Sequence, residues 1–244
     1  MSLVLGDLDQ DGTPDVVSSG GSLSMAGSLL SSKPSDGPAQ HLLAMWSGKT
    51  GAMLPASPVV LEDFTFFNNQ AIADLTGDGY PEVLTGSGGY YVHAVDACGR
   101  EAEGWPKFTG QWVIATTAVG DVDGDDKLEV VVNSRSGWLY AWHTKGTTDG
   151  VITWESFHHD NRNTGNLDVP LDQGKLMGAA TPLELDSEGK CVQAEEPTPT
   201  PATKQDLSPE GGCGCSVPSS RRTPTALLGL LAALGLLFRR RRRS

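Results

Sequence analysis

The sequence predicts an all-β fold built from three similar units of short strands. An acidic segment of the form D-x-[DT]-x-D-x-x-x-[DE] occurs three times, at residues 7–15, 74–82 and 121–129. Each copy lies between two short apolar runs, which is the pattern of strands joined by turns. The chain also has 30 Gly and 15 Pro among its 244 residues, so long uninterrupted helices are not expected.

Each unit contains a first strand before the acidic segment, a second strand after it, and an aromatic-rich third strand beyond a turn. The expected strands are residues 3–5, 16–17 and 41–46 in the first unit, 71–73, 83–84 and 90–95 in the second, and 113–119, 130–132 and 138–142 in the third. A fourth stretch is expected near residues 53–54, 105–108 and 151–154.

The acidic segments begin 67 and 47 residues apart, and a Ser/Gly/Pro-rich stretch at 18–39 accounts for much of the longer spacing. This stretch indicates an inserted loop. Units of about 40–50 residues with four short strands are typical of β-propeller blades. We therefore expect residues 1–168 to form a partial propeller of about three four-stranded blades. A sandwich of unrelated strands is the alternative, but it leaves the repeated acidic segments unexplained.

The acidic segments carry the side chains that calcium-binding loops need. Ca²⁺ takes six to eight oxygen ligands, and carboxylates at alternating positions of a tight loop can converge on one ion. The sixth position, held by Gly12, Gly79 and Asp126, suits a sharp turn with positive φ. Thr76 replaces a carboxylate, so we expect the second site to be the weakest. The candidate ligands are Asp7, Asp9, Asp11, Thr13 (through its carbonyl) and Asp15, then Asp74, Thr76, Asp78, Tyr80 and Glu82, and then Asp121, Asp123, Asp125, Lys127 and Glu129.

Two other interpretations of these segments fit less well. An EF-hand loop needs a glutamate at position twelve and flanking helices, but that position holds Ser18, Thr85 and Val132 and the flanks are strand-like. Simple Asp/Gly turns would explain one copy. They do not explain three copies in the same strand–loop–strand setting.

The segments and the strands after them resemble the FG-GAP or VCBS repeats of integrin-α-type β-propellers. The resemblance rests on PDVV at 14–17, PEVL at 81–84 and LEVVV at 128–132, and most closely on the stretch from GDVD at 120–123 to GWLYAW at 137–142. It covers about residues 3–168 and implies that calcium binds between the first two strands of each blade. Such propellers serve adhesion, ligand binding and enzyme accessory roles alike.

Residues 154–165 are the one stretch that invites a catalytic interpretation, because Ser156, His158, His159 and Asp160 are close in sequence. Adjacent residues of an extended chain point to opposite faces, so the two histidines do not readily share a metal. The stretch also resembles the W-x-x-F-x-x-D-x-x-x-T-G segment bordering bacterial propellers of this kind, which implies packing against a terminal blade. No nucleophile elbow, P-loop or dinucleotide motif is present, and we expect no enzymatic activity.

Composition limits the partners. Seven of the 18 cations lie in the last 24 residues, which contain no acid, so residues 1–220 carry a formal charge of -19. Such a body is a poor nucleic-acid binder and suits divalent cations. The four cysteines match no zinc or redox pair, and whether Cys98 pairs with Cys191 stays open. Aromatic side chains are expected in the core rather than in a carbohydrate platform: Tyr90, Tyr91, Trp138, Tyr140 and Trp142.

The C-terminal part has a different organisation. Residues 169–194 form an extension with weak strand character, and residues 195–220 are rich in Pro, Thr, Ser and Gly, which predicts a disordered linker. An apolar run at 226–238, expected to be a short helix, ends in five arginines and is shorter than the roughly 20 residues that cross a membrane. A nucleic-acid-binding tail fits poorly, because the arginines directly follow a hydrophobic run.

The sequence GGCGC at 211–215, followed by a Ser/Pro spacer and residues 221–244, resembles the MYXO-CTERM sorting tag. The resemblance implies export, recognition by a membrane-embedded sorting protease, cleavage near Cys213 or Cys215, and anchoring at the cell surface or outer membrane. Calcium loops suit that compartment, because extracellular modules bind calcium weakly.

These features predict a surface-anchored, calcium-stabilised propeller that binds an extracellular protein or glycan. The alternative is an accessory propeller of a secreted hydrolase or lyase whose catalytic part lies upstream. The first residues carry no secretory signal, and propeller rings usually close with 4–8 blades. We therefore expect further blades from an N-terminal extension or from another chain.

Overall fold

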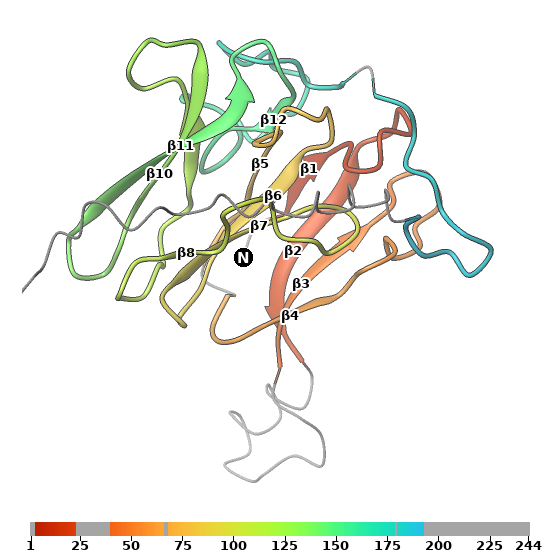
Figure 1. Ribbon diagram of the computed structural model, residues 1–244, viewed down its shortest axis with the longest axis horizontal. Helices are drawn as coiled ribbons and strands as arrows, with labels where there is room; N and C mark the ends of the chain where they lie inside the picture. Colours follow the sequence, from red (N-terminus) through yellow and green to blue (C-terminus); the bar gives the residue numbers. More distant parts are fainter. Residues whose placement is uncertain (1–2, 23–39, 66–67, 179, 193–244) are drawn as a thin grey trace, which may run out of the picture. The chain divides into compact units, whose positions relative to one another are not determined.

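The computed structural model describes residues 3–22, 40–65, 68–178 and 180–192, and within these ranges the chain forms twelve strands and no helix (Figure 1). The strands make three antiparallel sheets. The first sheet has the order β1 (Val4–Gly6), β2 (Asp15–Gly21), β3 (His41–Trp46), β4 (Val59–Leu61).

The second sheet has five strands and the third has three. The order in the second sheet is β12 (Ile152–Trp154), β5 (Ala71–Ala73), β6 (Glu82–Gly86), β7 (Tyr91–Val95), β8 (Lys107–Phe108). The order in the third sheet is β11 (Leu139–Thr147), β10 (Lys127–Asn133), β9 (Ala118–Gly120). All-β architecture in sheets of three to five strands is therefore confirmed.

Most expected strands lie where the apolar runs place them, but three differ clearly in their bounds. The first strand of the third unit is only Ala118–Gly120 rather than residues 113–119, because residues 113–117 lie outside any strand. β2 continues to Gly21, whose register partner is His41, so the inserted stretch begins after residue 21 rather than at 18. The fourth strand of the first unit is Val59–Leu61 rather than residues 53–54, because Met53 forms only a single bridge to Trp46.

The fourth stretch of the third unit does not join its own sheet. β12 pairs with β5 of the second sheet, with Ile152 opposite Ala73. Just beyond β12, the carbonyl of Glu155 accepts a hydrogen bond from Val119 N of β9, at 2.8 Å. Gly6 of β1 allows β12 to pack closely against β1, because a Cβ atom at position 6 would lie 2.4 Å from Thr153 Oγ1. The described strands therefore form sheets of four, five and three strands rather than three regular four-stranded blades.

The second sheet lies between the other two and is buried on both faces. Side chains alternate along a strand, so Val83 packs toward the first sheet and its neighbour Leu84 toward the third. The core on the side of the first sheet includes Val4, Val17, Leu43, Met45, Ile72, Val83 and Trp154. The core on the side of the third sheet includes Ala71, Leu84, Ala94, Leu128, Val130, Val132 and Ile152.

The aromatic residues divide between core and surface. Tyr140 and Trp142 stack with ring centroids 5.5 Å apart and pack against the core of the third sheet. Trp138, which was expected in the core, is 69% exposed because it lies in the turn before β11. Tyr90 is also exposed; it lies in a turn, where its φ is 76°.

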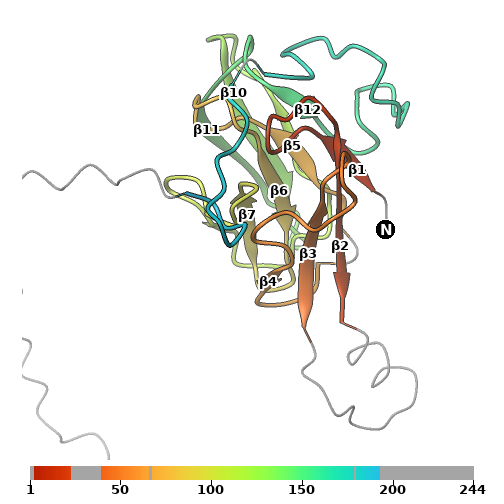
Figure 2. The same ribbon diagram turned by 90° about the vertical axis from the view of Figure 1, so that its right-hand side faces the viewer.

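The described residues of the C-terminal segment, 169–178 and 180–192, form no strand, but the segment is fixed at several points. Leu183 N donates a hydrogen bond to Asp9 O at 2.8 Å, and a disulfide joins Cys191 to Cys98 with a Cα–Cα distance of 5.8 Å. The segment runs along one side of the strands (Figure 2). It thereby connects the β1–β2 loop to the turn after β7.

Candidate metal centres in three acidic loops

Each acidic segment joins the first two strands of one sheet. We call residues 7–15 loop 1 (β1 to β2), residues 74–82 loop 2 (β5 to β6) and residues 121–129 loop 3 (β9 to β10). The ninth position of each loop lies on the second strand and is buried, at 0%, 3% and 3% exposure. Its carboxylate accepts the N–H of the second position: Leu8 N to Asp15 Oδ2 at 2.9 Å, Leu75 N to Glu82 Oε2 at 2.8 Å, and Val122 N to Glu129 Oε2 at 2.8 Å.

The first aspartate of each loop organises the turn. Its side chain accepts an N–H from the sixth position, Gly12 to Asp7 at 2.9 Å, Gly79 to Asp74 at 2.9 Å, and Asp126 to Asp121 at 3.1 Å. These hydrogen bonds restrict the rotation of the first aspartate's side chain and hold it toward the centre of the loop. The three segments are thus one structural motif repeated three times.

Positive φ occurs twice in each loop. The sixth position has φ values of 90° at Gly12, 92° at Gly79 and 66° at Asp126, as the sequence indicated. The fourth position was not singled out, yet it has φ values of 57° at Gln10, 79° at Gly77 and 83° at Gly124. Glycine at two of these three fourth positions was the signal that could have revealed it.

The carboxylates converge in two of the three loops. In loop 1, oxygens of Asp7, Asp9 and Asp15 lie within 4.8 Å of one another, and in loop 3 the same holds for Asp121, Asp123 and Asp125. Among the described residues no such group of three forms in loop 2, where Thr76 occupies the third position. Oxygen-only sites of this kind suit a hard cation such as Ca²⁺.

The remaining candidate ligands have other contacts. The carboxylate of Asp11 lies 3.5 Å from Lys49 Nζ and is not in the loop 1 group. The seventh position of each loop contributes its N–H to the carboxylate of the fifth position, at 2.9 Å from Thr13 to Asp11, from Tyr80 to Asp78 and from Lys127 to Asp125.

Without a bound cation, ionisation of the three converging carboxylates of loop 1 is unfavourable. Burial raises the pKa of Asp7 and Asp9, and it raises the pKa of Asp15 to about 6, with nearby carboxylates adding to each shift. A group whose pKa is raised in this way resists ionisation in the folded state. A bound divalent cation would remove that resistance by supplying the missing positive charge.

Loop 3 has an additional neighbour that the sequence did not reveal. His143 of β11 faces Glu129 across the sheet, with 2.8 Å between Nδ1 and Oε1, and these two residues group with Asp123. Only the register between β10 and β11 brings this histidine to the loop. No local sequence pattern connects residues 129 and 143.

The paired histidines do not form one site. His159 is fully buried with its ring edge against Trp154, at a centroid distance of 5.0 Å, whereas His158 stacks on the exposed Phe157 at 3.9 Å. Both have positive φ, and the turn is closed by Asp160, whose pKa is lowered to about 2 by hydrogen bonds from Thr164 and Arg162 N.

No protein-family model matches the chain, and no curated protein sequence matches it. The resemblance to FG-GAP or VCBS repeats therefore rests on the loop motifs themselves. Cys213, Cys215 and the expected apolar helix lie outside the described residues. Within the ranges that the structure describes, no helix is long and apolar enough to cross a membrane.

Proposed function

We propose that this chain is a calcium-stabilised, propeller-like binding module that acts outside the cell, in adhesion or ligand binding, and catalyses no reaction of its own. The observation that carries the proposal is the convergence of three carboxylates in loop 1 and again in loop 3. Each site lies between the first two strands of a sheet, which is where the FG-GAP or VCBS resemblance implies calcium.

Two further features support an extracellular role. The bond between Cys98 and Cys191 suits an oxidising compartment. The C-terminal sequence resembles a MYXO-CTERM tag, which implies export and a membrane-associated form at the cell surface. Millimolar extracellular calcium matches the affinity of such modules.

An adhesion assay tests the role directly. Beads coated with the chain should bind a protein or glycan surface of the producing cells in calcium and release it in chelator. A variant with both Asp9→Asn and Asp123→Asn should lose that dependence, because each change removes a carboxylate from one converging group. Binding that is equal in calcium, in chelator and in the double variant would contradict the proposal.

A further inference from the structure

Loop 3 differs from the other acidic loops in having a nitrogen donor beside it. His143 of β11 lies opposite Glu129 of β10, and an oxygen of Asp123 completes a group whose three ligand atoms lie within 4.8 Å of one another. Among the groups that the described residues form, this is the only one with a histidine. We call Asp123, Glu129 and His143 the mixed group, to distinguish it from the three aspartates of loop 3.

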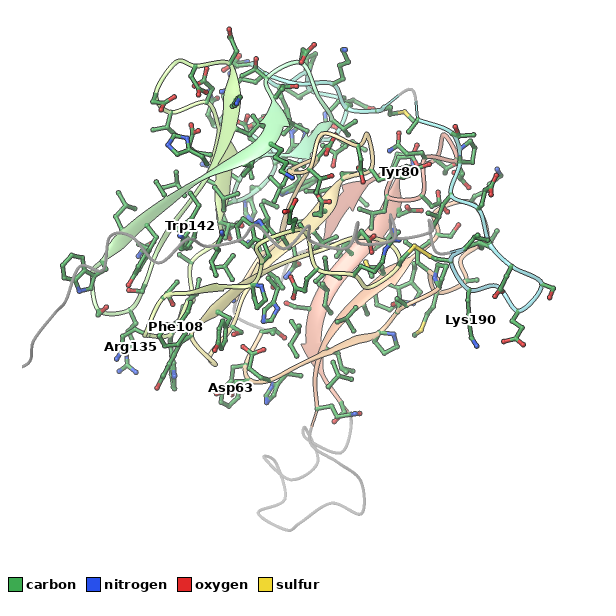
Figure 3. The ribbon with its side chains drawn as sticks, in the orientation of Figure 1. Asp63, Tyr80, Phe108, Arg135, Trp142 and Lys190 are labelled. Carbon is green, nitrogen blue, oxygen red and sulfur yellow. A yellow bond between two sulfur atoms is a disulfide. The ribbon has the colours of Figure 1, made fainter. Side chains whose placement is uncertain are left out.

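The fold directs His143 toward the loop rather than into the core. The preceding residue, Trp142, which is labelled in Figure 3, packs against the core of the third sheet. Side chains alternate along a strand, so His143 lies on the opposite face, beside its register partner Glu129. The His143 side chain is 69% exposed, and burial in the core therefore does not account for its position.

The two carboxylates of the mixed group are held differently. Glu129 is buried, and its Oε2 accepts the N–H of Val122, which leaves Oε1 facing His143 Nδ1 at 2.8 Å. Asp123 is exposed, and within the described ranges its carboxylate accepts no hydrogen bond and forms no ion pair. One carboxylate is thus fixed, while the other can rotate toward an ion.

Loop 1 shows what the histidine changes. Asp15 corresponds to Glu129, but its second oxygen, Oδ1, accepts the backbone N–H of Gly48 at 3.1 Å. A backbone N–H has no lone pair for a metal, whereas a neutral imidazole has one. The same place in the motif is therefore oxygen-only in loop 1 and contains a nitrogen ligand in loop 3.

A nitrogen ligand changes the ion that the site should prefer. Calcium takes oxygen ligands, whereas imidazole suits zinc and neighbouring transition metals. We propose that Asp123, Glu129 and His143 bind a divalent transition-metal ion of the zinc type, with water at the open position. The inference goes beyond the proposed function and does not require calcium at either loop.

The geometry of the pair fits such an ion after a small movement. Zinc lies about 2.0–2.2 Å from nitrogen and oxygen ligands, so two ligands in a tetrahedral arrangement are about 3.4 Å apart. A slight outward rotation of the exposed His143 side chain supplies this spacing. The ion then replaces the hydrogen bond between Nδ1 and Glu129, and the imidazole keeps its remaining proton on Nε2.

Imidazole ¹H–¹⁵N spectra of the full chain during a Zn²⁺ titration in calcium-free buffer test the inference. The chain carries Cys213→Ser and Cys215→Ser, because thiolates bind zinc. Zinc should shift the Nδ1 signal of His143 selectively among the five histidines, and the spectrum of His143→Gln assigns that signal. Zinc bound only to the carboxylates of loop 1 would not produce this shift.

Variants in the same background locate the site by calorimetry with Zn²⁺. His143→Gln and Asp123→Asn should each weaken zinc binding about tenfold or more, because each removes one of three ligands. Both side chains are exposed, so both variants should fold. His158→Gln, which alters a histidine outside the mixed group, is the matched control and should leave zinc binding unchanged.

Three results would overturn the inference: no zinc binding at submillimolar concentration, no selective shift of the His143 signal, or unchanged zinc affinity in folded His143→Gln. Calcium stoichiometry is measured separately in zinc-free buffer. Selective zinc binding without calcium binding would contradict the proposed function but not this inference. Calcium binding without zinc binding would contradict this inference alone.

Discussion

Glu62 and His93 connect the first and second sheets, with Glu62 Oε2 lying 2.9 Å from His93 Nε2. Glu101 Oε1 lies 2.5 Å from the other ring nitrogen, so the imidazole sits between two carboxylates. Burial disfavours its charge, but the hydrogen bonds that the imidazolium donates to these carboxylates prevail and raise the pKa of His93 to about 9. Burial likewise opposes ionisation of Glu62, but hydrogen bonds with His93 and Ser87 lower its pKa to about 2.

The first prediction is that this contact makes stability depend on pH in a defined window. The contribution of His93 is complete below about pH 6.5 and is lost as the pH rises through about 9. The contribution of Glu62 is complete above about pH 4.5 and is lost as the pH falls through about 2. Denaturant unfolding of wild type and His93→Gln should therefore differ most between about pH 4.5 and 6.5 and converge toward pH 9.

Glu62→Gln should reproduce only part of the change seen in His93→Gln, because Glu101 still accepts a hydrogen bond from His93 in that variant. Glu188→Gln, which alters an exposed carboxylate, should leave the profile unchanged. A constant difference between wild type and His93→Gln from pH 5 to pH 9 would show that the imidazole is not held as a cation.

The second prediction concerns the disulfide. Cys98 and Cys191 are 93 residues apart, and closing a loop of this length in the unfolded chain is expected to stabilise the fold by about 4–5 kcal/mol. Reduction should lower the melting temperature, as should Cys98→Ser. The double variant Cys98→Ser/Cys191→Ser should be insensitive to reductant. Superimposable melts of oxidised and reduced wild type would exclude a structural role for the bond.

The local parts of this fold could be predicted from the sequence. The expected strands at 41–46 and 71–73 coincide with β3 and β5, because short β-branched and apolar runs between turn residues are a local signal. The acidic loops also have a local sequence signal, and the repeated spacing of their acidic residues indicated that the three loops share one turn. Asp126 adopts the positive φ that its place in the repeat indicated.

The long-range parts could not be predicted. β12 pairs with β5, whose residues lie about 80 positions earlier, and nothing in residues 152–154 indicates that partner. A cavity of about 470 Å³ beside loop 2 also depends on tertiary structure, because Glu82, Glu101 and Glu184 line it from three separate segments of the chain. His143 reaches loop 3 only through the register of β10 with β11.

The third prediction links protons to calcium at loop 1. Burial raises the pKa of Asp15 from 3.8 to about 6, so its favourable contribution is complete below about pH 3.8 and is lost as the pH rises through about 6. In chelator, stability should therefore decline over this range. Saturating calcium should remove the decline, because the cation stabilises the ionised carboxylates.

Urea unfolding at several pH values, with and without calcium, measures this linkage. Asp9→Asn should weaken the effect of calcium, while Asp168→Asn, an exposed change outside the loops, should not. Parallel stability profiles in calcium and in chelator would contradict the expected competition.

The fourth prediction concerns the C-terminal sequence. If the MYXO-CTERM resemblance reflects processing, mass spectrometry of the surface form should find no peptide from residues 225–244 and should find a modified Cys213 or Cys215. The Cys213→Ser/Cys215→Ser variant should fail to reach the surface in processed form. An intact arginine-terminated chain as the major surface species would contradict it.

The most direct test of the central claim is the number of calcium ions bound by the full chain, measured by titration calorimetry. The convergence of carboxylates in loops 1 and 3 predicts about two ions per chain, with one lost in Asp9→Asn and the other in Asp123→Asn. Asp78→Asn in loop 2 should leave both. Binding of no calcium, or stoichiometry unaffected by Asp9→Asn and Asp123→Asn, would contradict the account.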